Sequence, residues 1–513
     1  MGSEGGSDRL VLLNANVITV DASLPRGDMI VVSDGRIAWV GEQSQASPST
    51  FAAADVIDCG GQTVVPGFID AHCHVLAYAA SLSAVDCSPS VEYSIEEILR
   101  RISRRAEVTP RGEWIRASGY SEFDLREKRH PTCLELDRAA PHHPVRLDHR
   151  SGHACVLNSI ALERVGIFAD TEEPPGGTIV RDLSSGVPNG LLLEMDEWLD
   201  GRIPPLSESD LSSAVAKASK EFLSRGVTTV VDATASNSLD RWNLLRRLRS
   251  DGRLVPSLTV MPGAGHIGDF QGAGLIHGYS DSLSAVGHVK IMLTVSGGRL
   301  HPTYEALLAM VERAHNCGFP VAIHAVEAEA VIAASEALAT HRVSGMRDRI
   351  EHASECPPNA LDALVKAKPV VVSQPSFIRD GGARYVSEFG EDAEWLYRFQ
   401  SLEDSGVVVA ASSDAPVSSP NPLTAMHAAV SRRAASGEVV GGDEKLSLYS
   451  ALKMHTVHAA YASYLEDEVG TITEGSRADF AVLSDDPTAA EVEGLLDIKV
   501  TMTIAGGEVV WQE

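Results

Sequence analysis

The stretch VVPGFIDAHCH, residues 64–74, is an apolar run that ends in two histidines separated by one residue. Alternate side chains of an extended strand point to the same side, so the imidazoles of His72 and His74 face one way. Two imidazoles at this spacing can bind one metal ion together. A His-x-His pair also occurs on ordinary strands, so the pair alone leaves metal binding and a structural role equally open.

The region after this stretch alternates apolar strand-like runs with amphipathic helix-like segments, which is typical of a parallel α/β architecture. The clearest strand-like runs lie at 226–234, 287–295, 319–326, 349–353, 369–376 and 406–416. Helix-like segments lie at 94–107, where Ser94 and Glu97 form a capping-box pattern, and at 303–317, 327–340 and 422–434. With residues 64–72 as the first strand, this repetition predicts a TIM (β/α)8 barrel.

Both ends of the chain contain short strand-like runs joined by tight turns. These runs lie at 9–21, 29–41, 478–487 and 498–512, with turn signals at Asp34-Gly35 and Gly506-Gly507. We therefore expect a small composite β-sandwich built from residues 1–65 and 465–513. The catalytic barrel is expected at 66–464, with the least regular stretch, 110–200, as a decorating insertion at its mouth.

Four further polar residues end or interrupt apolar strands of the predicted barrel: Lys290, His324, His352 and Asp414. The carboxyl ends of parallel barrel strands meet on one face, where active sites lie. Imidazole and carboxylate are suitable ligands for first-row metals, and zinc is the commonest choice for hydrolysis. The sequence therefore predicts a site for one or two divalent ions, zinc first among them, made by these residues with His72 and His74.

Each of these residues also has a structural interpretation. A histidine at a strand end can be a hydrogen-bonded core residue, and Asp414 can cap a helix, because Pro416 follows closely. Lys290 lies in an apolar strand, where a charged amine needs a partner or a chemical change. It is either a salt-bridged core lysine or a lysine carbamylated by carbon dioxide, and both remain open.

The chain resembles the amidohydrolase superfamily, in particular its YtcJ-like branch, which includes N-substituted formamide deformylases. PGFIDAHCH (66–74) is similar to the superfamily's first metal motif, and RIEHA (349–353), SSDAP (412–416) and EGSRADFAVL (474–483) to its later landmarks. Further segments resemble this branch: WIRASGY (114–120), HPTCLELDRAAPHHPV (130–145), SGHACVLNS (151–159) and NGLLLE (189–194). Lys290 is followed by Thr294-Val-Ser-Gly-Gly298, where the branch commonly has Asp-Gly.

The resemblance implies a mono- or binuclear metal centre that hydrolyses an amide-type C–N bond with a metal-activated water. His72, His74 and Asp414 would bind one ion, His324 and His352 a second, and carbamylated Lys290 would bridge them. In a single-metal alternative the same histidines and Asp414 share one ion. Asp414 would also take the proton of the water and pass it to the leaving nitrogen.

Residues outside this set are candidates for contacts with the substrate. His153, within SGHACVLNS, is the first, as a contact of the substrate or its oxyanion, and a loop residue without a role is its alternative. Glu194 can reach the pocket or form a surface salt bridge. His266, Arg299 and His301 follow predicted strands and are weaker candidates.

Composition and charge limit the partners. Lysine and arginine total 43 against 70 aspartate and glutamate, a net charge of −27 that disfavours nucleic acid and anionic membranes. The seven cysteines form no Cys-x-x-Cys pair, and the first residues lack a signal-peptide pattern, so we expect a cytoplasmic protein that acts on a small molecule. The sequence leaves the oligomeric state open, a homo-oligomer included.

Other functions fit the same residues. A metal site of this kind also supports deamination, lactam or ester hydrolysis, or lyase chemistry, because the fold does not fix the reaction. A catalytically silent barrel that acts as a binding protein is an alternative of another class.

Overall fold

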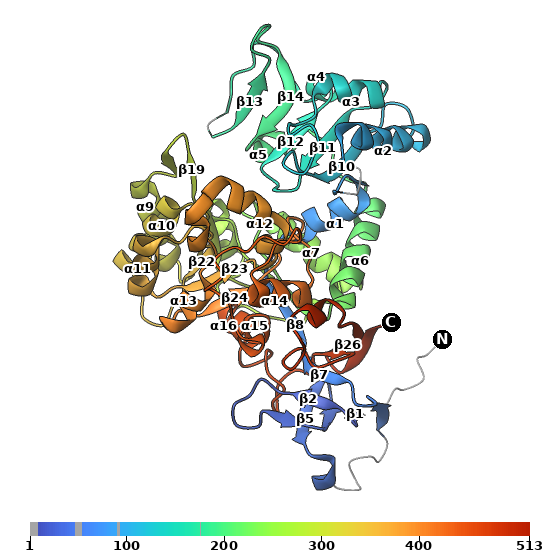
Figure 1. Ribbon diagram of the computed structural model, residues 1–513, viewed down its shortest axis with the longest axis vertical. Coiled ribbons are helices and arrows are strands. Elements are labelled where there is room, and N and C mark those ends of the chain that lie inside the picture. Colours follow the sequence, from blue (N-terminus) through green and yellow to red (C-terminus); the bar gives the residue numbers. More distant parts are fainter. Residues whose placement is uncertain (1–8, 47–53, 90–92, 175) are drawn as a thin grey trace. The chain divides into compact units, whose positions relative to one another are not determined.

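The computed structural model describes residues 9–46, 54–89, 93–174 and 176–513 (Figure 1). The chain divides into two compact units. The first unit contains Met1–His74, Ser219–Asp414 and Ser419–Glu513, and the second contains Val75–Ala218 and Ala415–Ser418. The stretch 110–200 therefore belongs to a compact unit that begins earlier and ends later in the chain.

Two parallel sheets form the centre of the first unit. One has the order β17-β16-β15-β8, with strands Ala285–Val286, Ser257–Val260, Val227–Asp232 and Phe68–Cys73. The other has the order β18-β21-β22-β23-β24, with strands Val289–Met292, Val321–Ala325, Arg349–His352, Val370–Ser373 and Val409–Ala411. Most of these strands lie within the predicted runs, whereas β16 and β17 were not predicted.

Two backbone hydrogen bonds connect the two sheets, one between the β16 and β18 regions and one between the β24 and β8 regions. Lys290 N donates to Pro262 O at 2.9 Å, which joins the start of β18 to the segment after β16. Asp414 N donates to His72 O at 2.9 Å, which joins the segment after β24 to β8. The carboxyl ends of the first and last strands in the series therefore lie next to each other.

Helices alternate with these strands, and three of them lie side by side in Figure 1: α9 (Tyr304–Asn316), α10 (Ala328–Thr340) and α11 (Pro358–Ala367). The predicted helices at 303–317 and 327–340 are confirmed as α9 and α10. The helix α14 (Pro422–Ser431) ends before residue 434, because Arg432 turns left-handed (φ 57°) and its buried guanidinium donates to backbone carbonyls. Within the described ranges, no helix combines the length and the apolar character needed to cross a bilayer.

Strands from both ends of the chain pair in one six-stranded sheet, β27-β26-β25-β7-β2-β3. Its strands are Glu508–Gln512, Val500–Ala505, Phe480–Leu483, Thr63–Pro66, Asn16–Ile18 and Arg26–Gly27. The N-terminal region also forms a four-stranded sheet with the order β5-β4-β1-β6. Its strands are Arg36–Gly41, Met29–Ser33, Arg9–Leu13 and Asp55–Asp58. Apolar side chains of both sheets, including Leu12, Ile30, Val482 and Ile504, pack in one cluster.

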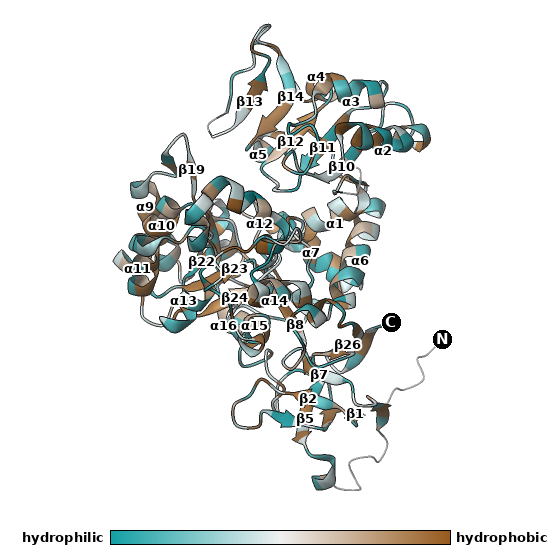
Figure 2. Cartoon of the chain, viewed as in Figure 1, coloured by the Kyte–Doolittle hydropathy of each residue, from teal (hydrophilic) through white to brown (hydrophobic). Residues whose placement is uncertain are grey.

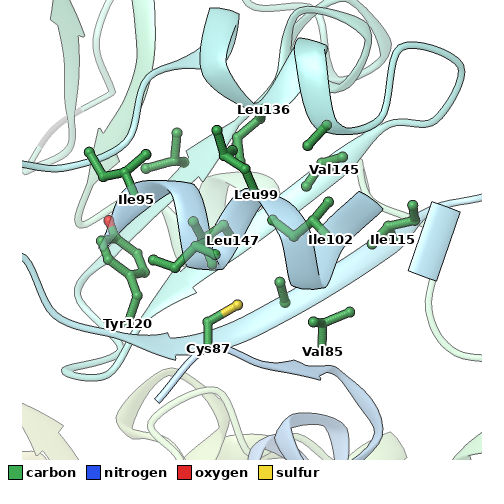
Figure 3. Packing of buried hydrophobic residues seen from close by; sticks show 14 of the residues in the cluster. Val85, Cys87, Ile95, Leu99, Ile102, Ile115, Tyr120, Leu136, Val145 and Leu147 are labelled. Carbon is green, nitrogen blue, oxygen red and sulfur yellow. The ribbon is translucent and has the colours of Figure 1, made fainter. Parts of the chain in front are cut away.

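The second unit is more regular than the sequence indicates. Its six-stranded sheet has the order β13-β14-β12-β11-β10-β9, with strands Thr178–Arg181, Pro188–Leu193, Ala154–Leu157, Val145–His149, Ile115–Tyr120 and Val85–Asp86. Helices α2 (Ile95–Val108) and α3 (Cys133–Ala139) pack on this sheet through Leu99, Leu136 and Leu147 (Figure 3). The mixed colours of α2 in Figure 2 reflect one apolar and one arginine-rich side. Ser94 caps α2 by accepting from Glu97 N, which is one half of the predicted capping box; the Glu97 carboxylate instead accepts from Arg101 Nε at 2.9 Å.

Candidate metal centre

Three of the predicted ligands form a compact cluster at the end of β8 and β24. Asp414 Oδ1 lies 3.0 Å from His74 Nε2 and 3.5 Å from His72 Nε2. The ligand atoms of these three residues lie within 4.8 Å of one another, a spacing that suits a metal ion. His72 is buried, whereas the side chain of His74 is 26% exposed and leaves the cluster accessible on its side.

Left-handed backbone positions direct two of the candidate ligands. Asp414 has φ 55° and His352 has φ 71°, values that cost energy for residues other than glycine. In a regular strand, Glu351 and His352 would point to opposite faces. The turn at His352 removes this alternation, so Glu351 contacts His72 while the His352 ring lies 5.0 Å from the His72 ring.

The Nδ1 atoms of three histidines are all occupied by neighbouring side chains. These contacts are His72 with Glu351 Oε2 at 2.5 Å, His74 with Thr234 Oγ1 at 3.1 Å, and His352 with Gln374 Oε1 at 2.8 Å. Within the described part of the chain, the buried Nε2 of His352 has no hydrogen-bond partner. A metal-binding histidine uses one ring nitrogen for a neighbouring group and presents the lone pair of the other to the ion. The occupied Nδ1 atoms and the unsatisfied, buried Nε2 of His352 match this pattern, so this donor set fits a divalent cation.

Lys290 and His324 lie against the same histidines. Lys290 Nζ is 3.5 Å from His72 Nε2, and its side chain is buried. No salt bridge of Lys290 occurs among the described residues, so a simple ion pair does not account for it. His324 is buried at the end of β21, and its ring lies 4.5 Å from the ring of His352.

Burial and charge set the protonation states in the cluster. Burial, together with the charge of Lys290, lowers the pKa of His72 to about 3. Burial likewise lowers the pKa of Lys290 to about 8, although the charges of Glu351 and Asp414 oppose it. Burial would raise the pKa of Asp414, but the hydrogen bond from His74 and the charges of the histidines outweigh it and hold that pKa low. Burial also lowers the pKa of His352, so the cluster combines the neutral imidazoles of His72 and His352 with one carboxylate at neutral pH.

His153 and Glu194 are paired with each other in the second unit. His153 Nδ1 lies 3.0 Å from Glu194 Oε1, and both side chains are about half exposed. The pair corresponds to the salt-bridge interpretation of Glu194. His266 lies in the first unit beside Asp269 at 3.3 Å, and Arg299 and His301 are exposed on the hairpin strand β20 (Arg299–His301).

Sequence reasoning missed the residues that hold the histidines. Glu351 is fully buried and accepts from Arg349 Nε at 2.7 Å and Arg349 Nη2 at 2.8 Å. Gln374 and Thr234 each contact one histidine of the site. One signal was available: RIEH places an arginine and a glutamate two residues apart in a buried strand, and such charges need each other.

Buried neutral histidines make the stability of the metal-free protein depend on pH. The pKa of His455 is also about 3, because of burial, whereas an unfolded histidine titrates near 6.5. Below that value the unfolded chain binds protons that the folded chain excludes, so stability falls as pH falls. We expect each of His72 and His455 to contribute about 1 kcal/mol of loss per pH unit below about 6. Urea unfolding at pH 7 and pH 5 measures this loss, and His455→Gln should reduce it; equal stability at both pH values would contradict the expectation.

Comparisons with known proteins identify relatives that match nearly the whole chain. A family model described as the amidohydrolase family matches residues 55–511. The chain is 32% identical to the N-substituted formamide deformylase of Arthrobacter pascens, over 97% of each chain. It is 26% identical to a Bacillus subtilis (strain 168) protein named as amidohydrolase YtcJ, over 95% of this chain and 96% of that one. An uncharacterized metal-dependent hydrolase from Pyrococcus horikoshii OT3 has a similar fold, with a TM-score of 0.77, 24% identity, and coverage of 94% of this chain and 99% of that one.

Proposed function

Because the chain belongs to the amidohydrolase family, we propose that it is a metal-dependent hydrolase of amide-type C–N bonds whose substrates are N-formyl or N-acyl amines. One observation carries the proposal: His72, His74 and His352 each engage a neighbouring side chain through Nδ1. His72 and His74, at the end of β8, lie beside Asp414, and His352 comes from the end of β22 to the His72 ring. The name of the Arthrobacter relative supports the N-formyl class.

The proposal includes an architecture. We propose that β8, β15, β16, β18, β21, β22, β23 and β24 close into a TIM barrel within residues 66–464. The hydrogen bond from Asp414 N to His72 O supports closure between the last and first strands. The sheet that pairs β7 with β25 supports a composite β-sandwich from residues 1–65 and 465–513.

The proposed ligands divide into two groups. His72, His74 and Asp414 would hold one ion, and His324 and His352 a second, with Lys290 between them; zinc is the ion we propose. A divalent ion bound there lowers the pKa of a water molecule and polarises the scissile carbonyl. The chain's own contribution is to hold His72 and His352 neutral and to orient their imidazoles through contacts at Nδ1.

Asp414 is the proposed proton carrier. Its pKa is held low, so its carboxylate is free of protons at neutral pH and can accept one from water. The same oxygen then gives the proton to the leaving nitrogen, which departs as a neutral amine. In the metal-free chain this carboxylate oxygen lies 3.0 Å from His74 Nε2, so both groups already face the same point.

We expect Lys290 to be carbamylated. The lone pair of its neutral amine adds to the carbon of carbon dioxide, one proton leaves the nitrogen, and an anionic carbamate results. Chelator-stripped protein should then regain less activity with zinc in buffer freed of carbon dioxide than in buffer with bicarbonate. Lys290→Met should be insensitive to bicarbonate, and complete recovery of the unchanged protein without carbon dioxide would contradict carbamylation.

Two measurements test the proposed function. Metal analysis of protein purified without chelator should find one or two ions per chain, and their removal should abolish activity that zinc restores. A panel of N-formyl amines, N-acyl amines, lactams and esters then identifies the reaction from the product. Protein that holds no stoichiometric metal and gains no activity on reconstitution would favour a binding protein, and product only from lactams or esters would replace the amide assignment.

His153 is proposed as a contact of the substrate, from the sequence argument. We expect His153→Ala to raise KM or lower kcat while leaving the metal content unchanged. If His153→Ala leaves both KM and kcat unchanged, His153 does not contact the substrate.

A further inference from the structure

Four buried residues at the ends of neighbouring strands form a ring of hydrogen bonds around His352. Ser373 Oγ donates to His352 O at 2.7 Å, and Ser412 Oγ donates to Ser373 O at 3.4 Å. Gln374 Nε2 donates to Ser412 Oγ at 2.9 Å, and Gln374 Oε1 lies 2.8 Å from His352 Nδ1. The ring spans the ends of β22, β23 and β24, which are neighbours in their sheet (Figure 1).

Counting protons around the ring sets the direction of each bond. The Ser412 hydroxyl has one proton, and Ser373 O, which only accepts, lies 3.4 Å from Ser412 Oγ. With the proton directed there, Ser412 Oγ accepts from Gln374 Nε2 at 2.9 Å. An amide that donates through Nε2 presents Oε1 on its other side. Because an amide oxygen only accepts, His352 Nδ1 must carry the imidazole proton.

The reverse arrangement leaves a buried donor unsatisfied. If the Gln374 amide were turned over, Nε2 would donate to His352 Nδ1, and the imidazole proton would lie on Nε2 of the ring. That Nε2 is buried and has no acceptor in the described part of the chain. A buried N–H without an acceptor is costly, whereas a buried lone pair can be satisfied by a cation.

We propose that Gln374 and Ser412 are positioning residues that fix the tautomer of His352 so that its Nε2 presents a lone pair to a divalent ion. Gln374 acts directly on the imidazole, and Ser412 acts only through Gln374. The inference rests on the metal centre proposed above. It adds that the ring selects one of two neutral forms of His352 before any ion arrives.

Burial makes each hydrogen bond of the ring necessary for the next. Gln374 is fully buried, and the side chains of Ser373, Ser412 and His352 are 1%, 1% and 3% exposed. No water competes for these hydrogen bonds in such an environment, so each group needs its partner in the ring. Removing one partner therefore changes the orientation of the next.

Zinc affinity measured by competition with a chromophoric chelator tests the inference. We expect Gln374→Met, which keeps the volume and removes the acceptor, to weaken zinc binding by about 10–100-fold. Ser412→Ala should give a loss in the lower part of this range, because it frees the amide to turn over. Since Ser412 acts through Gln374, the double variant should bind zinc as Gln374→Met does.

Ser373→Ala is the matched control. Ser373 has the same burial as Ser412 and belongs to the same ring, but it bonds to the backbone of His352 rather than to the partner of its imidazole. We expect this variant to lose thermal stability without weakening zinc binding. Thermal melting of every metal-free variant separates loss of folding from loss of affinity.

The outcomes are distinguishable. Zinc affinity unchanged in Gln374→Met, losses that add in the double variant, or an equal loss in Ser373→Ala would each overturn the tautomer inference. If the protein without any substitution binds no zinc, the proposed metal centre itself would be overturned.

Discussion

Asp414→Asn should lower kcat by about 10²–10⁴-fold, the usual contribution of a general acid–base group. The amide nitrogen and oxygen of asparagine occupy the same space as the carboxylate, but they cannot accept the proton of water at neutral pH. The same change removes the charge that faces His74 and His72 at 3.0 Å and 3.5 Å. Steady-state kinetics with the zinc-loaded variant measure the loss.

Metal analysis of the same variant divides the two roles of Asp414. Zinc retained at the level of the unchanged protein, with activity lost, assigns Asp414 mainly to proton transfer. Zinc lost together with activity assigns it mainly to metal binding. Turnover near that of the unchanged protein would remove Asp414 from the site.

A partly buried aspartate outside the cluster provides the control. Asp348 accepts from His315 Nε2 at 2.9 Å and from Val321 N at 2.9 Å, and it has no contact with the proposed ligands. We expect Asp348→Asn to keep kcat while lowering the melting temperature. A comparable fall of kcat in this variant would show that the loss in Asp414→Asn is not specific to the cluster.

The ligand types and their strand-end positions could be predicted because both follow from local pattern. His72 and His74 are two residues apart on a strand, and Asp414 follows an apolar run, so each is recognisable within a window of about ten residues. The parallel alternation then implies that the carboxyl ends of their strands meet. No contact between distant residues has to be known.

The sequence signals that Arg349 and Glu351 pair, but the contacts of the supporting residues with the histidines could not be predicted, because these contacts depend on broken periodicity and on distant pairs. Glu351 precedes His352 directly, so strand alternation assigns the two to opposite faces, and only the left-handed backbone of His352 brings both to the site. The regularity of 110–200 was hidden in a similar way. Arg146 and Asp148 interrupt β11 with charges whose further partner, Asp196, lies 50 residues from Arg146.

Arg349→Leu should destabilise the protein by about 3–5 kcal/mol, the cost of leaving one member of a buried ion pair without its partner. Arg349 and Glu351 are both fully buried, and Arg349 also donates to Ala71 O at 2.9 Å. The guanidinium outweighs burial and holds the pKa of Glu351 far below its usual value. Without it, Glu351 must ionise alone in the core or take up a proton. Urea unfolding of the metal-free protein measures the loss.

A surface ion pair is the control for this change. Lys499 and Glu513 lie 3.1 Å apart with side chains 67% and 53% exposed, so Lys499→Ala should change stability by less than about 1 kcal/mol. Equal effects of the two substitutions would contradict the importance of burial for the Arg349–Glu351 pair.

The double variant Arg349→Leu/Glu351→Leu separates stability from metal binding. Replacing both charges by apolar groups removes the unpaired carboxylate, so we expect it to recover part of the stability lost in Arg349→Leu. Zinc binding should stay weak, because His72 Nδ1 then lacks the carboxylate that fixes its proton and its orientation. Recovery of both properties would mean that Glu351 stabilises the fold without positioning His72, and recovery of neither would mean that the apolar pair does not fit the space of the charged one.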